Sequence, residues 1–200
     1  MSKIISVKQT QTDEIVKLSK EILIKDGIFI YPTDTIYGFG CLMSSIVGAQ
    51  RIKKIKDRFE NKPFIHLANN VEMVLKYIHN PSELSLKLMN KFWPGPMTLI
   101  LPTKFSTIAF RIPQNNFCLE ITKSLNEPIT STSINKTDHP PLTNISAIIN
   151  LYRNDVDLII DDGNSHNLQP SSIIDVSKSK PVIIRKGTLS NEIEKFINEN

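Results

Sequence analysis

The sequence predicts a mixed α/β or α+β fold in a single domain covering residues 1–200. Short apolar runs typical of buried strands alternate with segments whose apolar residues recur at helical spacing, and the connections are too uneven for a regular βαβ array. Apolar residues make up 40% and charged residues 22% of the chain, which is ordinary for a globular protein. A chain of 200 residues is long enough for one well-buried core.

The first predicted helix covers residues 12–25. Its apolar residues recur at helical spacing, Thr12 can cap its first turn, and Gly27 follows its end. The run Ile-Phe-Ile-Tyr at 28–31 then predicts a short buried strand, because an apolar and aromatic run ends abruptly at Pro32.

The later elements follow the same two patterns. Apolar residues at helical spacing predict helices at 45–56, 71–78, 82–92, 116–124 and 145–153, and a closing helix from Glu192. Short apolar runs predict strands at 63–67, 97–101, 108–112, 128–131, 157–160, 172–176 and 181–185. The Trp-Pro-Gly-Pro sequence at 93–96 predicts a turn.

Several classes of protein and site are excluded by the sequence. No stretch approaches the roughly 20 apolar residues of a membrane span, and the first residues lack the apolar region of a secretory signal, so we expect a cytoplasmic protein. Cys41 and Cys118 have neither CxxC nor zinc-like spacing and are expected to be small buried thiols. The four histidines form no pair at i, i+4 spacing, which argues against a dedicated transition-metal site.

The nucleotide-binding signals in this sequence are cationic side chains. A net charge of +4 suits a nucleotide or RNA but decides nothing alone. GxxxxGK[ST] and GxGxxG motifs are absent, so a phosphate would need side-chain cations. Lys56 offers a mobile point charge and Arg58 a planar fork at the end of a predicted helix. A solvated basic helix end, complementing the helix dipole, explains the same two residues.

Polar residues follow the apolar strands repeatedly, and ligands in α/β proteins tend to bind at strand ends. Arg111 and Arg185 each close a predicted strand. Ser131, Ser133 and Asn135 alternate along an extended segment, so they would face the same side and could meet one ligand. Local turn hydrogen bonds explain these three equally well. Because no G-x-S-x-G motif is present, covalent serine catalysis is not expected.

Seven segments in this order resemble the YrdC-type family of L-threonylcarbamoyladenylate synthases, from about Ile28 to Gly187. They are PTDTIYGFGC, KDRFENKPF, FWPGPMTLIL, FRIP, PITSTSIN, PSSIID and IIRKG. The resemblance implies an open, twisted, mixed sheet flanked by helices, with a large concave basic cavity. It also implies synthesis of threonylcarbamoyl-AMP from ATP, L-threonine and bicarbonate, with Mg²⁺ on the triphosphate. The product would serve the t6A modification of tRNA, completed by partner proteins, and the length resembles the short form of the family.

The resemblance further implies two groups of site residues. L-threonine would be bound by Thr35, Tyr37, Arg111, Ser131 and Ser171. ATP would be bound by Lys56, Arg58, Lys62, Thr107, Ser133, Asn135 and Arg185. Lys56 and Arg58 are the expected catalytic residues, since cations neutralise charge developing on phosphate. Tyr37 is equally typical of core packing.

The sequence departs from the family pattern in three places. The family commonly has SAN followed by serine and glycine, where this chain has the bulkier SINKTDHPP. Longer relatives carry a histidine where this chain has Leu67, and His66 lies one residue earlier, on the opposite strand face, so His66 is assigned no catalytic role. Ser-Ser-Ile at 171–173 replaces Ser-Thr-Val. Two alternatives remain open: an RNA-binding accessory protein, and a paralogue acting on another carbamoyl-type substrate.

Overall fold

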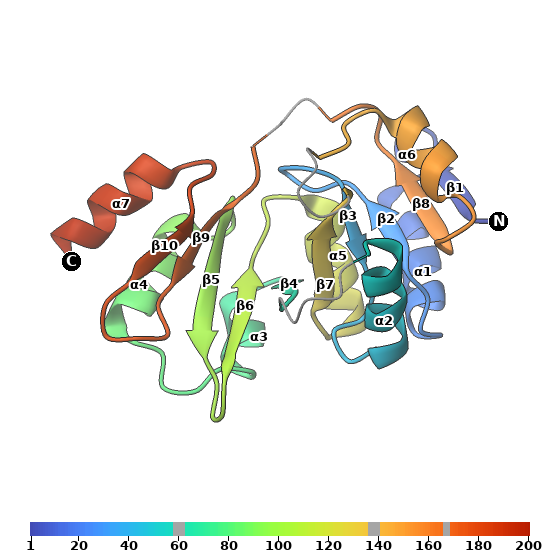
Figure 1. Ribbon diagram of the computed structural model, residues 1–200. Coiled ribbons are helices and arrows are strands. Elements are labelled where there is room, and N and C mark those ends of the chain that lie inside the picture. Colours follow the sequence, from blue (N-terminus) through green and yellow to red (C-terminus); the bar gives the residue numbers. More distant parts are fainter. Residues whose placement is uncertain (58–62, 136–140, 166–168) are drawn as a thin grey trace.

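The structure is a computed structural model that describes residues 1–57, 63–135, 141–165 and 169–200 (Figure 1). Within these residues the strands form one mixed sheet in the order β1-β8-β2-β3-β7-β4-β6-β5-β9-β10, which confirms the predicted mixed α/β class. The strands are β1 (Lys3–Ser6), β2 (Phe29–Tyr31), β3 (Gly38–Gly40), β4 (Ile65–Leu67), β5 (Met97–Pro102), β6 (Thr107–Arg111), β7 (Ile129–Ser133), β8 (Leu158–Asp161), β9 (Ser172–Asp175) and β10 (Val182–Arg185). The helices are α1 (Thr12–Leu23), α2 (Ile46–Ile55), α3 (Val71–Leu75), α4 (Glu83–Phe92), α5 (Asn116–Leu125), α6 (Ile145–Tyr152) and α7 (Ser190–Glu199).

The centre of the sheet brings sequence-distant polar residues together. Strand β4 pairs in parallel with β6 and antiparallel with β7, so that Ile65 lies opposite both Ala109 and Ser131. Neighbouring strands are about 4.8 Å apart, so Ser131 lies about 10 Å from the strand that ends at Arg111. On the far side of β6, strand β5 pairs in parallel with β9.

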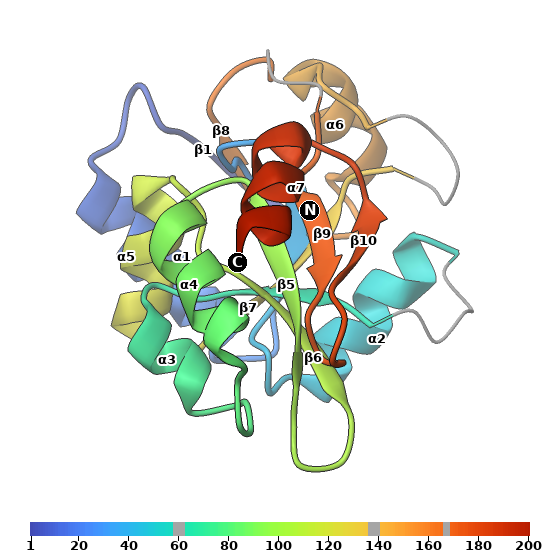
Figure 2. The same ribbon diagram turned by 90° about the vertical axis from the view of Figure 1, so that its left-hand side faces the viewer.

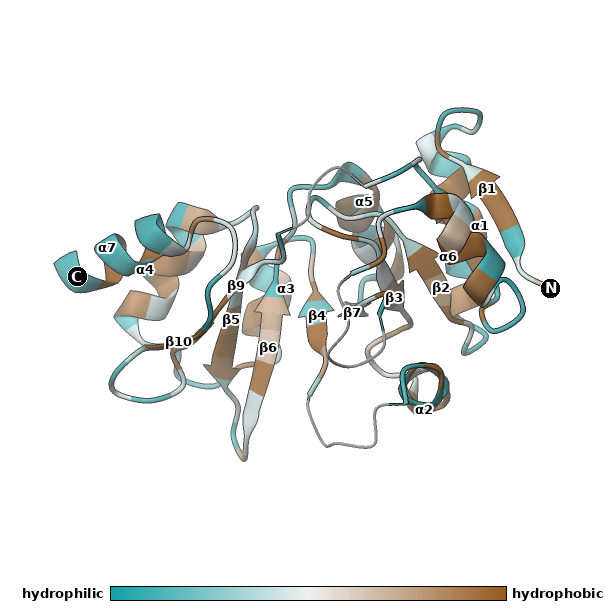
Figure 3. Ribbon diagram, turned by 45° about the horizontal axis from the view of Figure 1, so that its top comes forward, coloured by the Kyte–Doolittle hydropathy of each residue, from teal (hydrophilic) through white to brown (hydrophobic). Residues whose placement is uncertain are grey.

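Three apolar clusters cover the sheet unequally. One joins α1 and α5 to β2 and β8, and a second joins α2 and α6 to β2, β3 and β8. The third joins α3, α4 and α7 to β5, β6 and β9 (Figure 1). Among the described residues, helices therefore cover both faces of the β2–β8 part but only one face of the β5–β6–β9 part. Figure 3 shows β2 and β5 as largely hydrophobic strands and α7 as a largely hydrophilic helix.

The predicted helices form, with corrections at their ends. Helix α1 is capped by Gln11 rather than Thr12, and no side chain bonds to its first turn, because Thr12 is already helical. Its end has Asp26 at φ 60° and Gly27 close against the carbonyl of Ile22, where a Cβ atom would lie 2.6 Å from the oxygen. Helix α3 stops at Leu75, three residues early, and α7 begins at residue 190.

Two strands, β1 and β3, were not predicted. Strand β1 pairs only with β8, and Lys3 and Ile4 are exposed, so its sequence lacks a clear inward face. Strand β3 has glycine at two of three positions, which weakens any strand pattern. Gly40 is required by packing, because a Cβ there would lie 2.5 Å from the Phe29 ring.

Candidate active site

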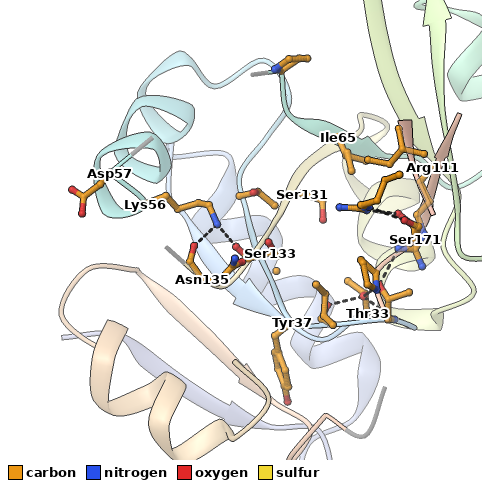
Figure 4. Close-up of a pocket in the computed structure, with 18 residues that line it drawn as sticks. Thr33, Tyr37, Lys56, Asp57, Ile65, Arg111, Ser131, Ser133, Asn135 and Ser171 are labelled. Carbon is orange, nitrogen blue, oxygen red and sulfur yellow. Dashed lines mark hydrogen bonds between the residues drawn. The ribbon is translucent and has the colours of Figure 1, made fainter. Parts of the chain in front are cut away.

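A cavity of about 670 Å³ lies where the central strands meet the segment after β2 (Figure 4). Its walls come from strands β4, β6 and β7, from the end of α2, and from the segments flanking β9 and β10. The hydroxyl, amide and charged side chains that line it are Thr33, Thr35, Tyr37, Lys56, Asp57, Arg111, Ser131, Thr132, Ser133, Asn135, Ser171 and Arg185. Three of these side chains are cations, which gives the cavity an affinity for anions.

Arg111, the last residue of β6, is held in place by groups on three sides. Its Nε donates to the carbonyl of Gly95 at 3.0 Å, and one terminal nitrogen donates to Oγ1 of Thr35 at 3.0 Å. The other terminal nitrogen forms an ion pair with Oδ1 of Asp34 at 2.5 Å. Oδ2 of Asp34 accepts from the backbone N–H of Gln114 at 3.1 Å. The guanidinium is therefore fixed before any ligand arrives.

The segment after β2 folds into a turn closed by its own hydroxyl groups. Oγ1 of Thr33 accepts from the backbone N–H of Thr35 at 3.1 Å and donates to the carbonyl of Ile36 at 2.8 Å. The two threonine hydroxyls lie 3.0 Å apart, and Ser165 donates to the carbonyl of Thr35 at 3.3 Å. This turn presents Thr35 to the cavity while its hydroxyl stays within reach of Arg111.

Arg185, at the end of β10, reaches the cavity beside Ser171. Its Nε donates to the carbonyl of Ser171 at 3.0 Å and a terminal nitrogen donates to Oγ of Ser171 at 3.1 Å. That Oγ also lies 2.9 Å from Oγ1 of Thr98. Burial, and secondarily the charge of Arg111, lowers the pKa of Arg185. No acidic side chain among the described residues pairs with Arg185, so its charge is available to an anion.

Lys56 closes α2 and is only 5% exposed. Its ammonium donates to the main-chain carbonyls of Ser133 and of Asn135, the latter at 2.6 Å, and lies 5.9 Å from the centre of the Phe39 ring. The interpretation of Lys56 as a mobile point charge is therefore wrong. Figure 4 shows Lys56 and Arg111 reaching into the cavity from opposite walls.

The sequence model of a protein family, named Sua5_yciO_yrdC and described as "Telomere recombination", matches residues 21–187. This range covers most of the chain. The chain belongs to the Sua5/YciO/YrdC family.

Individual members of the Sua5/YciO/YrdC family are similar over the whole chain. The chain is 29% identical over 213 aligned positions to a threonylcarbamoyl-AMP synthase of Pyrococcus abyssi, and it spans 62% of the length of that protein. The crystal structure of P. abyssi Sua5 complexed with L-threonine superposes with a TM-score of 0.89 at 25% identity, covering 100% of this chain and 61% of that one. The crystal structure of Escherichia coli YciO superposes with a TM-score of 0.84 at 26% identity, covering 94% of this chain and 97% of that one.

Most residues that the resemblance to this family implied are brought together by the fold. Both implied groups, each drawn from several distant parts of the chain, line the same cavity: Thr35, Tyr37, Arg111, Ser131 and Ser171, and Lys56, Ser133, Asn135 and Arg185. Ser131 and Ser133 alternate along β7 as predicted, although Thr132 also reaches the lining. The local-turn explanation of this segment does not account for such convergence.

Tyr37 contributes its ring to the lining while its hydroxyl points away from the cavity (Figure 4). The hydroxyl donates to the carbonyl of Gly163 at 2.8 Å and accepts from the backbone N–H of Asp162 at 2.9 Å. Burial raises the pKa of Tyr37 to about 12. The core-packing interpretation of this residue is confirmed, because the ring belongs to the apolar cluster around α2 and α6, whereas its role in threonine binding stays a prediction.

Of the three other implied nucleotide residues, Thr107 alone lies within the described residues, and it does not line the cavity. Arg58 and Lys62 lie outside the described residues, as does the 136–140 part of SINKTDHPP. Thr107 lies on the same alternating face of β6 as Arg111, but four residues away, about 13 Å along the strand. It is exposed beside the tip of the β5–β6 hairpin, which projects from the molecule in Figure 2. Its role in nucleotide binding stays a prediction.

His66 lies in β4 beside the Phe110 ring, with ring centres 5.8 Å apart, and is not among the residues that line the cavity. Burial lowers its pKa to about 4. Cys41 and Cys118 are buried free thiols, as predicted. Within the described residues, no three His, Cys, Asp or Glu side chains are grouped to hold a metal ion, and no helix is both long and apolar enough to cross a membrane.

Sequence reasoning missed three residues that build the site: Thr33, Asp34 and Thr98. Thr33 closes the turn, Asp34 pairs with Arg111, and Thr98 bonds to Ser171. The only signal in the sequence was the density of polar residues in PTDT, which does not say which of them contacts a ligand. Thr98 lies within an apolar run that predicts a strand, so the sequence did not indicate that it contributes to the site.

Proposed function

We propose that this protein makes L-threonylcarbamoyl-AMP from L-threonine, bicarbonate and ATP, with release of pyrophosphate. The observation that carries the proposal is the convergence of Lys56, Arg111 and Arg185, from three distant parts of the chain, on one cavity. Each substrate carries at least one anionic group, so such a cavity suits all three together. Similarity to the P. abyssi threonylcarbamoyl-AMP synthase supports the same reaction.

The amino-acid end of the cavity is the part around Arg111. Three of the five N–H groups of its guanidinium are used by Gly95, Thr35 and Asp34, and two remain for a substrate carboxylate. A planar fork fits a carboxylate better than a point charge does. The hydroxyls of Thr35, Ser131 and Ser171 line the same cavity and can bond to the polar groups of L-threonine.

The nucleotide end is the part around Lys56 and Arg185. Because the chain has no glycine-rich phosphate loop, these cations and the side chains of Ser133 and Asn135 take its place, together with Arg58 and Lys62 of the undescribed segment. ATP enters as its magnesium complex, in which phosphates and water hold the ion. Among the described residues, Asp57 is the one carboxylate that lines the cavity, which agrees with a metal that arrives on its substrate.

The reaction needs no protein nucleophile. The threonine amine adds to the carbon of CO₂ and loses a proton, which gives a carbamate; when bicarbonate is the carbon source, a water molecule leaves instead. A carbamate oxygen then attacks the α-phosphorus of ATP in line, and the bond to pyrophosphate breaks. The protein contributes proximity, by holding two anions together, and neutralises charge that develops on the phosphates through Lys56 and Arg185.

The product is a reactive mixed anhydride, which fits a role as an intermediate for another enzyme. We propose that partner proteins transfer its threonylcarbamoyl group to tRNA in t6A synthesis. Binding of tRNA by this chain itself is not required by the reaction.

Incubation of the purified protein with MgATP, L-threonine and ¹³C-bicarbonate tests the proposal. Mass spectrometry is expected to find an adenylate that contains threonine and one labelled carbon. Omission of threonine or ATP should remove this product. Absence of the labelled adenylate from a folded protein would contradict the proposal.

A further inference from the structure

Asp34 forms an ion pair with Arg111 but is not among the residues that line the cavity. The Asp34 side chain is 12% exposed and the Arg111 side chain 6% exposed. Arg111 lines the cavity, whereas Asp34 lines a neighbouring hollow of about 290 Å³ that shares Thr33, Thr35 and Tyr37 with it. The carboxylate therefore contacts the guanidinium without being one of the groups that line the cavity.

Both oxygens of Asp34 are used to join the turn to the end of β6. Oδ1 accepts from Arg111 and Oδ2 accepts from the N–H of Gln114. The carbonyl of Gly95 and the hydroxyl of Thr35 hold the other nitrogens of the guanidinium. Removing the carboxylate would leave a buried cation with neutral partners only, and a buried ion that loses its partner shifts or becomes hydrated.

We propose that Asp34 is a positioning residue for the amino-acid carboxylate, acting through Arg111. This inference rests on the proposed function. Asp34 fixes the plane of the guanidinium, so that its two remaining N–H groups point at the carboxylate position. It also balances the positive charge of Arg111, so that the guanidinium does not form a different ion pair while no substrate is bound.

The substitution Asp34→Asn isolates this role with little change of shape. The carbonyl of an Asn side chain could accept a hydrogen bond from one of the two present donors, Arg111 or the N–H of Gln114. Its NH₂ group would then face the other donor and could not accept a hydrogen bond from it. The guanidinium would lose its charge partner and its fixed plane. Asp162→Asn is the matched control, since Asp162 lines the same hollow but is exposed and forms no ion pair with Arg111.

Binding of L-threonine and of L-threoninamide, which lacks the carboxylate, is measured by calorimetry for the wild type and both variants. Asp34→Asn is expected to weaken threonine binding about tenfold, which corresponds to about 1.4 kcal/mol. Threoninamide binding, MgATP binding and the control variant should change less than about threefold. A general structural role would instead weaken threonine and threoninamide alike.

Equal losses for both ligands, or unchanged or tighter threonine binding, would overturn the inference. In an Arg111→Lys background Asp34→Asn should have little further effect on threonine binding, and additive losses would also overturn it. If Asp34→Asn does not fold, Asp34→Glu, which keeps the charge but displaces it, enters the same comparison. A wild type that binds neither threonine nor MgATP would refute the proposed function, and this inference with it.

Discussion

Lys56 and Asn135 are 79 positions apart in the sequence, yet the ammonium of Lys56 donates to the carbonyl of Asn135 at 2.6 Å. The same ammonium donates to the carbonyl of Ser133. These bonds tie the end of α2 to the end of β7, so one buried cation both shapes a wall of the cavity and supplies positive charge to it.

Lys56→Met is expected to abolish threonine-dependent pyrophosphate release. The change removes the charge and leaves two carbonyls without their donor, which should lower the free energy of unfolding by about 2 kcal/mol. Initial rates and urea denaturation measure the two effects. Lys54→Met, an exposed position of the same helix, is the control and should change neither. Full activity of Lys56→Met would contradict the assignment of Lys56 to the active site.

Ser171→Ala is expected to weaken use of L-threonine, because its hydroxyl is placed at the amino-acid end of the cavity, and also of MgATP, because Ser171 Oγ accepts from Arg185. The KM for MgATP should rise about fivefold, the factor for a typical hydrogen bond worth roughly 1 kcal/mol. Initial rates at varied MgATP measure it, and Ser106→Ala in the exposed hairpin should have no effect. A rise in the KM for threonine alone would show that Ser171 serves only the amino acid.

Tyr37→Phe is expected to lower stability while leaving both KM values within about twofold. Loss of the hydroxyl leaves the N–H of Asp162 and the carbonyl of Gly163 without a partner, at a cost of about 1 kcal/mol in the free energy of unfolding. Denaturation in urea measures this change.

The stability of Tyr37→Phe should also depend on alkaline pH differently from the stability of the wild type. Burial holds the pKa of Tyr37 at about 12 in the folded protein, above its ordinary value of 10.0. The unfolded chain therefore loses this proton first, so wild-type stability falls between pH 10 and pH 12. The Tyr37→Phe variant should not show the loss of stability that Tyr37 causes between pH 10 and pH 12. An identical pH dependence in both proteins would refute the assigned burial of Tyr37.

His66→Leu is expected to reduce the sensitivity of stability to acid. Burial lowers the pKa of His66 to about 4 from 6.5. The unfolded chain takes up this proton first, so the wild type loses stability as pH falls from 6.5 to 4. The loss attributable to His66 should be about 2 kcal/mol, after allowance for solvent screening. Denaturation at several pH values measures it, with His79→Leu as the control; equal acid sensitivity in both variants would contradict it.

Much of the fold was predictable because its apolar runs are distinct. Strands β5, β6, β8, β9 and β10 and helices α2, α4, α5 and α6 form where apolar periodicity placed them. Strand β3 was missed because two of its three residues are glycines, and one of them, Gly40, is required by packing against Phe29 rather than by strand preference. The pairing of β4 with both β6 and β7, which assembles the cavity, depends on long-range contacts that no local pattern encodes.

The site was predictable as a set of residues but not as a set of contacts. The family resemblance pointed to Thr35, Lys56 and Arg111, and the structure places all three in one cavity. It gave no indication that Lys56 is bound to carbonyls or that Asp34 pairs with Arg111, because these partners are 77 or more positions apart. Such contacts follow from the sheet order rather than from the motif.

The most direct test of the proposed function is pyrophosphate release by the purified protein with MgATP and bicarbonate, with L-threonine, with L-serine, or with neither. The account predicts release that depends on threonine and is much slower with serine. A folded protein that releases no pyrophosphate with threonine, or releases it equally without an amino acid, would contradict the account and favour an RNA-binding role or another carbamoyl-type substrate.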